Sequence, residues 1–355
     1  MPLDIVVLDL TRLLPGATAT AYFVQHGATV IKIEQPGSGD YARTTYAELF
    51  RATNGGKKSV AIDLKHPRGR DLLLRLVESA DVLIESFRPG AMARLALSYE
   101  DVRARNPRLI YASLTGYGQN GPYASLAGHD INYIAMGGLL GLNLPVIPGV
   151  QIADLAGGAM QAQTEILRAL LERVSSGQGC HLDISMTAGV RRLLTIPLAA
   201  WRGSGVEPQS GSELLSGKYA CYNLYQAGDG RWLAVGALEP KFWAELCHCL
   251  DCEELITAQY AQGDDQRRAK EYIAAAFRRR TAAEWFAELR DSDCCVTPVL
   301  TVSEVAAELA GLGHTGSAPA LGEHTREVLQ AHGASEAELT ELASSGVVAI
   351  TPQRQ

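Results

Sequence analysis

The sequence predicts an α/β protein with a parallel sheet in its first part and a smaller α+β domain in its second. In the first third, apolar runs such as Asp4–Leu10 alternate with leucine-rich helical segments such as Arg68–Ser79. Continuous apolar runs of this length are typical of strands that are buried on both faces of a sheet. Repeated β-α-β units then imply a parallel sheet with right-handed crossovers.

The elements of the large domain follow from where the apolar periodicity starts and stops. Gly27 ends the first helix, because glycine commonly follows the last helical residue, and the Ser-Ser-Gly triplet at 175–177 ends the longest helix. The predicted elements, in chain order, are the strand Asp4–Leu10, the helix Ala17–His26, the strand Ala28–Glu34, the helix Arg68–Ser79, the strand Asp81–Glu85, the helix Tyr99–Asn106, the strand Arg108–Leu114 and the helix Ala156–Val174.

The composition changes near Trp201, because residues 201–217 are rich in Gly, Ser, Glu and Pro and are predicted to form a linker. We expect a large domain of residues 1–200, rejoined by 311–355, and a small α+β domain of residues 218–310. The predicted elements after the linker are the strand Trp232–Ala237, the helices Pro240–Leu250, Asp264–Arg278 and Ala282–Arg290, the strand Val296–Leu300, and the helices Val302–Leu309 and Thr325–Ala331.

Composition and charge argue against several classes of protein. The 355 residues carry 32 basic and 39 acidic side chains, a net charge of −7, which disfavours nucleic-acid binding. No apolar run is long enough to span a membrane, and the N-terminal MPLDIVVLDL lacks the basic start of a signal peptide, so it is predicted to be a strand. The seven cysteines have no regular spacing, which predicts reduced thiols and a cytoplasmic location.

The tightest group of metal-type side chains is formed by Cys247, His248, Cys249 and Cys252. No second pair of ligands follows at the spacing of a zinc site, and the group lies on a predicted amphipathic helix. We therefore expect these side chains to be structural and expect no metal.

A dinucleotide site is the first functional hypothesis that the alternating pattern suggests. The first strand, helix and second strand, ending at Glu34, give the large domain a Rossmann-like outline. However, the turn at 11–16 lacks the glycines that let a backbone approach a pyrophosphate. Gly116, Gly118 and Gly121 match G-x-G-x-x-G, but no acidic residue follows at the distance that binds a ribose. Nicotinamide and flavin binding are therefore disfavoured.

Basic residues recur at the ends of predicted elements in the first hundred residues. The ends of strands in an open α/β sheet gather at one crevice, so as a group these residues favour a phosphate-bearing ligand. Any one of them alone is better explained as solvated surface charge. They are Arg43, Lys57, Lys58, Lys65 and Arg88.

His129 and Asp154 are the candidates for acid–base chemistry. His129 lies in Gly-His-Asp-Ile-Asn-Tyr (128–133), before an apolar helix, and Asp154 lies where the longest helix is expected to start. Taken alone, a carboxylate at a helix N-terminus is most often a cap, and a single histidine is most often structural.

These motifs resemble those of the family III CoA-transferase superfamily and, within it, the α-methylacyl-CoA racemases. The similarity covers nearly the whole chain in the family's order. His129 and Glu239, the latter in Gly-Ala-Leu-Glu-Pro, match the racemase pattern, whereas the transferases of the superfamily need only the aspartate at Asp154. Gln35 departs from the pattern, because a basic residue usually precedes this Pro-Gly turn. The matching segments are Leu14–Gly16, Gln35–Asp40, Asn54–Lys65, Asp81–Gly90, Asn106–Gly121, Gly128–Tyr133, Ala153–Gly158, Ser176–Gly179, Val235–Phe242, Cys295–Leu300 and Ala318–Leu329.

The resemblance implies an acyl-CoA substrate with a methyl branch at C2, and an enzyme that inverts this carbon through an enolate. It implies that His129 and Asp154 are the two acid–base groups on opposite sides of C2. Glu239 is expected to accept a hydrogen bond from the other ring nitrogen of His129, and the Asp130 amide to donate to the enolate oxygen. No metal or redox cofactor is expected, because CoA is part of the substrate.

CoA is expected to lie across the crevice of the large domain. Three basic side chains are assigned to its phosphates, the backbone at 62–63 to adenine, and a glycine to the close approach of the thioester. The residues expected to contact CoA are Arg43, Ile62, Asp63, Lys65, Arg88, Gly128, Asp130 and Tyr133.

The resemblance also implies an intertwined homodimer of interlocked rings, because Glu239 belongs to the small domain and His129 to the large one. Two other functions stay open. In a CoA-transferase, Asp154 attacks the acyl-CoA carbonyl and then carries CoA as an aspartyl thioester, with His129 as a bystander. A non-enzymatic acyl-CoA binder retains affinity for CoA without turnover. None of these readings involves a nucleic-acid or membrane partner.

Overall fold

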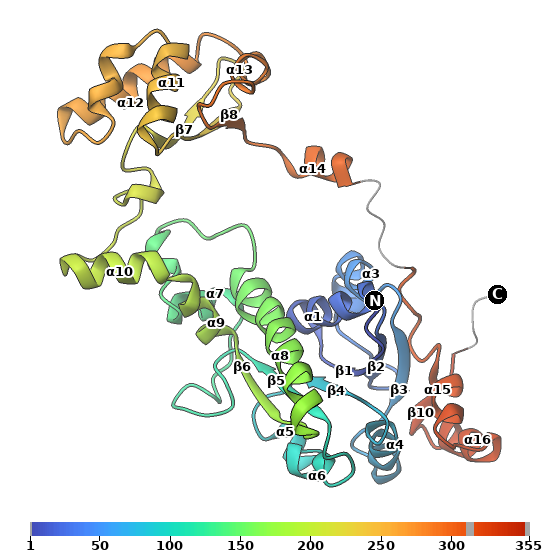
Figure 1. Cartoon of the computed structure of the whole chain (residues 1–355). Coiled ribbons are helices and arrows are strands. Elements are labelled where there is room, and N and C mark those ends of the chain that lie inside the picture. Colours follow the sequence, from blue (N-terminus) through green and yellow to red (C-terminus); the bar gives the residue numbers. More distant parts are fainter. Residues whose placement is uncertain (1, 310–315, 352–355) are drawn as a thin grey trace. The chain divides into compact units, whose positions relative to one another are not determined.

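The computed structural model describes residues 2–309 and 316–351 and divides the chain into two compact units (Figure 1). The large unit comprises the residues up to Leu140, Pro145–Thr195 and the described residues from 316 onward. The small unit comprises Gly141–Leu144 and the described residues from Ile196 to 309. The sequence predicts a return to the large domain at 311, which lies outside the described residues.

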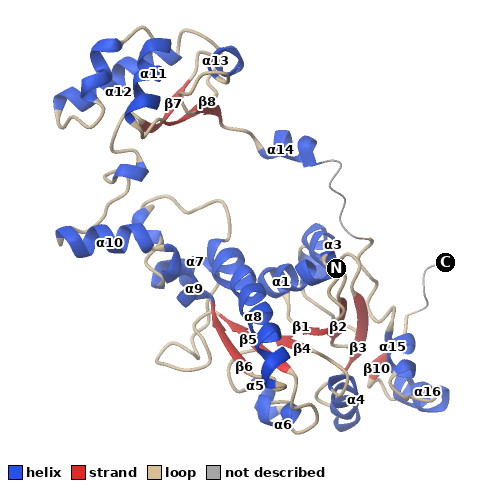
Figure 2. Cartoon of the chain, viewed as in Figure 1, coloured by secondary structure: helices blue, strands red, loops and turns tan. Residues whose placement is uncertain are grey.

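A seven-stranded sheet forms the centre of the large unit, with the strand order β10-β3-β2-β1-β4-β5-β6. Its neighbouring strands are parallel, except that β10 runs antiparallel to β3, which confirms the predicted mostly parallel sheet. Figure 2 shows the strands in red. They are β1 (Val6–Leu10), β2 (Thr29–Glu34), β3 (Lys58–Ile62), β4 (Val82–Glu85), β5 (Ile110–Thr115), β6 (His181–Ser185) and β10 (Val348–Ala349).

Helices cover both faces of this sheet and close two separate cores. Side chains alternate along each strand, so that Leu8 of β1 points into one core and Val7 into the other. The first core is closed by α4 (Pro67–Val77), α5 (Ala91–Arg94), α6 (Tyr99–Arg103), α15 (Thr325–Ala331) and α16 (Glu336–Ser344). The second core is closed by α1 (Leu13–Gln25), α7 (Asp130–Met136), η2 (Ala153–Met160), α8 (Gln161–Ser176) and α9 (Met186–Leu193).

The helix predicted for Ala156–Val174 has two parts in the structure. Its first part, η2, is a π-helix, and its second part, α8, is an α-helix that ends at Gly177 in the left-handed region, with φ of 69°. The π-helical turns of η2 pack closely against α9 where Gly157 of η2 meets Gly189 of α9. A Cβ on Gly189 would lie 2.2 Å from the Gly157 carbonyl oxygen. Only glycine fits at such a contact, and π-helical turns occur frequently at functional sites.

A buried network of charges fixes the turn between β1 and α1. Asp9 accepts hydrogen bonds from Thr11 and Thr20 and is paired with Lys57, while Lys32 is paired with Asp40 at 3.0 Å. All four charged side chains are buried. Lys57, which the sequence places among candidate ligand-binding residues, is therefore part of the core.

The small unit is an α+β structure around its own core. Its sheet has the order β7-β8-β9 and is antiparallel throughout the described strands. The strand β7 was not predicted; the bounds of the predicted elements agree closely with those observed, although β9 is shorter than expected. The elements are β7 (Tyr222–Gln226), β8 (Trp232–Gly236), α11 (Pro240–Cys249), α12 (Asp264–Phe277), α13 (Ala282–Leu289), β9 (Val296–Pro298) and α14 (Val302–Glu308).

Apart from Gly141–Leu144, the small unit begins at Ile196, so it includes the segment predicted to be a linker. Residues 195–204 form the helix α10 (Thr195–Ser204), so the first part of the predicted linker is helical. Among the described residues, no helix is long and apolar enough to cross a membrane. No three His, Cys, Asp or Glu side chains in the described part of the chain are grouped so that they could hold a metal ion.

Candidate active site

His129 occupies the position just before α7, where the chain turns into the helix. Its backbone N–H donates to Asn132 Oδ1 at 3.0 Å, and the Asn132 N–H donates to the His129 carbonyl at 2.8 Å. These reciprocal bonds fix the start of α7 and leave the imidazole exposed. The Gly-His-Asp-Ile-Asn-Tyr motif is thus a helix start that presents a histidine to solvent.

Asp154 lies near the start of η2, beside the start of α7. Its backbone N–H donates to Asp130 Oδ1 at 3.0 Å, although the two residues are 24 positions apart. Burial and, to a smaller extent, the negative charge of Asp130 raise the pKa of the Asp154 carboxyl to about 6, while His129 opposes the shift. The structure therefore brings the His129 and Asp154 side chains close enough to interact electrostatically, with a carboxyl group that can hold or release a proton near neutral pH.

Tyr133 fills the space next to Gly128. Its hydroxyl donates to the Gly128 carbonyl at 2.5 Å, and a Cβ on Gly128 would lie 2.7 Å from Tyr133 Cε1. The ring also meets Tyr117 edge-on, with centroids 5.1 Å apart. Burial raises the Tyr133 pKa to about 12, so the phenol is neutral at physiological pH. Glycine is needed at position 128 because the Tyr133 ring occupies the space of a side chain. We expected this glycine to make room for a thioester.

A cavity of about 350 Å³ opens at the carboxyl ends of β1 to β4. Lys65 and Ile62, two of the residues predicted to contact CoA, line it, and Leu10, Ile33 and Phe87 give it apolar walls. Carboxyl ends of parallel strands are where ligands bind in open α/β sheets.

Two arginines that the sequence analysis did not select also line this cavity, Arg12 and Arg94. The Arg12 guanidinium lies 5.5 Å from the centre of the Phe87 ring, and its backbone N–H donates to Ser86 Oγ at 3.2 Å. Arg12 follows β1 directly, so its place at a strand end could have identified it. Gln35, where a basic residue is usual, lines the same cavity.

Arg43 has protein partners on all sides. Its Nε and Nη2 donate to the two carboxylate oxygens of Glu34 at 2.8 and 2.6 Å, and Nη1 donates to the Pro319 carbonyl at 2.9 Å. The guanidinium also lies 4.1 Å from the centre of the Phe50 ring. These contacts join the short helix α2 (Ala42–Thr45), which follows β2, to the returning C-terminal segment, a role that the sequence does not predict.

The backbone at 62–63 is also occupied. Ile62 pairs with Val348 of β10, and the Asp63 N–H donates to the Val347 carbonyl at 2.8 Å. The Asp63 carboxylate accepts from the Lys65 N–H at 3.0 Å. The Asp63 N–H, which belongs to the backbone expected to meet adenine, therefore already has an acceptor next to β10, a strand that was not predicted.

Arg88 lines a second, smaller cavity of about 90 Å³, which does not include Lys65. Glu85, Ser113 and His181 face the same space, and the Ser113 hydroxyl lies 3.0 Å from His181 Nε2. Burial raises the pKa of Glu85 to about 7. The structure thus separates two of the three cations that were assigned to CoA phosphates.

Glu239 belongs to the small unit, where it precedes α11 and is exposed. Its carbonyl accepts from the backbone N–H groups of Phe242 and Trp243 at 3.0 and 3.1 Å, which fixes the start of that helix.

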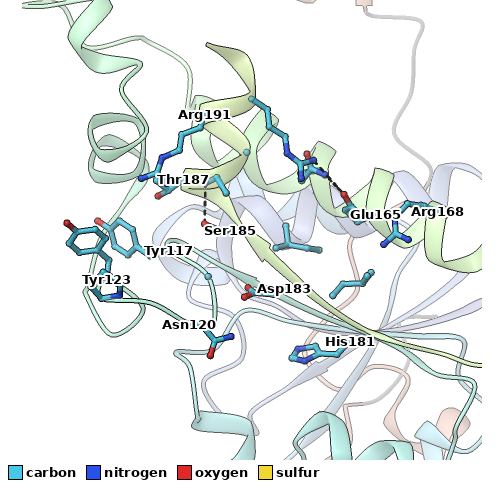
Figure 3. Close-up of a pocket in the computed structure, with 18 residues that line it drawn as sticks. Tyr117, Asn120, Tyr123, Glu165, Arg168, His181, Asp183, Ser185, Thr187 and Arg191 are labelled. Carbon is cyan, nitrogen blue, oxygen red and sulfur yellow. Dashed lines mark hydrogen bonds and ion pairs between the residues drawn. The ribbon is translucent and has the colours of Figure 1, made fainter. Parts of the chain in front are cut away.

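The largest cavity described, of about 720 Å³, contains none of the predicted site residues. It lies along β6, which is the edge strand of the sheet, and Figure 3 shows His181, Asp183 and Ser185 of this strand facing it. Arg168 of α8 and Arg191 of α9 border it from the other side.

Known proteins with both kinds of activity are similar to this chain. Residues 3–328 match CoA-transferase family III. The chain is 34% identical to a human α-methylacyl-CoA racemase, with 96% of each chain covered. It is 33% identical to an acetyl-CoA:oxalate CoA-transferase of Acetobacter aceti, with 86% of this chain and 82% of the relative covered. A crystal structure of a CAIB/BAIF family protein from Brucella suis superposes with a TM-score of 0.81 at 27% identity, covering 94% of this chain and 99% of that one.

Proposed function

Because the chain belongs to CoA-transferase family III, we propose that it is an enzyme that epimerises 2-methylacyl-CoA thioesters at C2. The observation that carries the proposal is that His129 lies near enough to Asp154 to act on its charge, at the adjoining starts of α7 and η2. Asp154 is half-buried, and its pKa of about 6 lets it exchange protons at neutral pH.

The proposed reaction moves one proton off C2 and another onto its opposite face. In one direction the His129 imidazole takes the C2 proton, and the electron pair of the C–H bond moves toward the thioester carbonyl to give an enolate. The Asp154 carboxylic acid then donates its proton to the other face of C2. The reverse direction exchanges these two roles, and no metal or redox cofactor takes part.

The enolate oxygen needs hydrogen-bond donors that are already in place. We assign this role to the Asp130 amide at the start of α7, because the first N–H groups of a helix have no partner within it. We assign the CoA moiety to the cavity of about 350 Å³, where Lys65, Arg12 and Arg94 supply positive charge and the apolar walls suit a nucleobase. Arg88 is assigned to the pantetheine side, because its charge acts on Tyr133.

We further propose a homodimer in which the small unit of one chain supplies Glu239 to His129 of the other. The pairing of the Glu239 carboxylate with the second ring nitrogen would fix the orientation of the imidazole. We also propose a cytoplasmic location, because all seven cysteines are free thiols.

A CoA-transferase is the second candidate, favoured by the identity of 33% to the oxalate enzyme. In that reaction Asp154 attacks the acyl-CoA carbonyl and releases CoA as a thiolate. The thiolate then attacks the acyl-aspartyl anhydride, releasing the acid and leaving CoA on Asp154.

The two candidates are separated by incubating the enzyme with 2-methylacyl-CoA in D2O and following the C2 proton by NMR. We expect exchange and inversion that His129→Ala and Asp154→Asn each reduce by at least about 10²-fold. Asp183→Asn is the matched control and should keep the activity of the original enzyme. Transfer of CoA to an added carboxylate, with a hydroxylamine-sensitive CoA adduct on Asp154 and no exchange at C2, would contradict the racemase proposal.

A further inference from the structure

Asp130 has a side-chain role that its place in the motif does not reveal. It is the first residue of α7, and its Oδ1 accepts the Asp154 backbone N–H at 3.0 Å. The carboxylate therefore joins the two segments that carry His129 and Asp154. Among the described residues, no other side-chain hydrogen bond links α7 to η2.

This hydrogen bond acts where the backbone of η2 most needs an acceptor. The first N–H groups of a helix have no carbonyl partner within the helix, and a negative charge near them is favourable. A carboxylate at this point therefore holds the Asp154 backbone more firmly than a neutral acceptor would.

The same carboxylate places a negative charge beside the Asp154 side chain. Burial is the largest cause of the raised Asp154 pKa, and the charge of Asp130 adds to it, while His129 opposes it. Tyr133 of α7 is neutral, and Arg191 of α9 is held by the Met136 carbonyl at 3.3 Å. The helix α1, which also packs on η2, carries no charged residue, and Glu165 of α8 is paired with Arg168.

We propose that Asp130 is a positioning residue of the reaction, whose single carboxylate fixes the Asp154 backbone and, by its charge, favours the protonated form of the Asp154 side chain. This inference rests on the proposed function, in which Asp154 must alternate between acid and base. Without the neighbouring charge, the pKa of Asp154 is lower and a smaller fraction of its side chain is protonated at neutral pH.

Asp130→Asn separates the two parts of this role. Asparagine keeps an oxygen that can accept the Asp154 N–H but removes the negative charge. In the direction in which Asp154 is the base, we expect the acid limb of the pH profile of kcat/KM to move to lower pH by roughly 0.5–1 unit, because Asp154 then ionises more easily. The KM for the acyl-CoA should change by less than about twofold, since Asp130 does not hold CoA through this oxygen.

Asp130→Ala removes the acceptor as well as the charge. We expect the same shift of the acid limb and, in addition, a fall in kcat of about tenfold or more, because small displacements of a catalytic group are costly. Asp183→Asn is the matched control, because the Asp183 carboxylate also accepts a backbone N–H, that of Gln119 at 2.9 Å, but does not act on Asp154. It should leave the acid limb in place.

Two results would overturn the inference. An acid limb that stays in place in a folded Asp130→Asn enzyme contradicts the role of the charge. A kcat that is the same in Asp130→Ala and Asp130→Asn contradicts the role of the hydrogen bond.

A titration that needs no turnover separates this inference from the proposed function. In protein labelled with ¹³C at the aspartate carboxyl groups, the Asp154 signal is identified by its loss in Asp154→Asn. If the enzyme does not act on C2, a midpoint that moves to lower pH in Asp130→Asn still supports the electrostatic role of Asp130. An unmoved midpoint contradicts that role, whatever reaction the enzyme catalyses.

Discussion

Asp9 and Asp154 are both withdrawn from water in the large unit, yet their surroundings drive their pKa values in opposite directions. Burial would raise the pKa of Asp9, but the charges of Lys32 and Lys57 and two threonine hydroxyls hold it well below its usual range. Asp154 has burial and a like charge, and its pKa rises. The comparison shows that a buried carboxyl becomes a fixed structural charge or a proton carrier according to whether cations surround it.

The largest effect should follow from disturbing the fully paired network. Asp9→Asn leaves Lys57 without its charged partner, so we expect the free energy of unfolding to fall by about 3–5 kcal/mol. Urea unfolding at neutral pH measures the change. Arg267→Gln, which breaks the exposed pair with Asp264, is the control and should have almost no effect. A loss for Asp9→Asn as small as that of the control would contradict the structural role of the network.

Glu85 extends the comparison, because it is a buried carboxyl for which no cationic partner is seen among the described residues. Its pKa is raised to about 7, so the folded protein retains a proton that the unfolded chain releases above the ordinary value of 4.5. The stability that this group contributes is therefore present below pH 4.5 and is lost as the pH rises through about 7.

Glu85→Gln removes this titration while keeping an oxygen for the Phe87 N–H. We expect the variant to be more stable than the original protein at pH 8 by roughly 2 kcal/mol, and the difference to vanish near pH 4. Urea unfolding of both proteins across this range is the measurement. If the variant were less stable than the original protein at pH 8, the ionised Glu85 carboxylate would have a stabilising partner, which contradicts the prediction.

Arg43 and Lys65 sharpen the comparison between structural and ligand-binding cations. Arg43 is held by Glu34, Pro319 and Phe50, so Arg43→Gln should lower the free energy of unfolding by about 1–2 kcal/mol. Lys65 is exposed at the cavity, so Lys65→Gln should leave stability unchanged and raise the KM for acyl-CoA about tenfold. Denaturation and steady-state kinetics on both variants check the two halves. If Arg43→Gln raised the KM and left stability unchanged, while Lys65→Gln lowered stability, Arg43 would bind phosphate and this prediction would be wrong.

The sequence predicts the elements that local patterns define. The strands around Leu8, Val30, Leu83 and Ala112 are apolar on both faces, and their positions follow from that pattern alone. The selection of His129 and Asp154 as candidates follows from family motifs and not from spacing, because a lone histidine and a capping aspartate are ambiguous.

What the sequence does not predict depends on contacts between distant segments. The π-helical turns of η2 arise where Gly157 meets Gly189, and no helical periodicity announces such a contact. The two-residue strand β10 is too short for a periodic signal, so the acceptor of the Asp63 N–H was missed. Arg12 and Arg94 are distant in the sequence. They line one cavity because α5, which carries Arg94, packs on the same core as β1, which precedes Arg12.

The pairing of β10 with β3 has a consequence for synthesis on the ribosome. Residues 58–62 emerge early, but the partner that covers their free edge is made only at Val348 and Ala349. The small unit, apart from four residues, is continuous from Ile196 and can condense first. The nascent large unit must therefore keep an exposed, unpaired strand from associating with other chains until residues 348–349 have been synthesised.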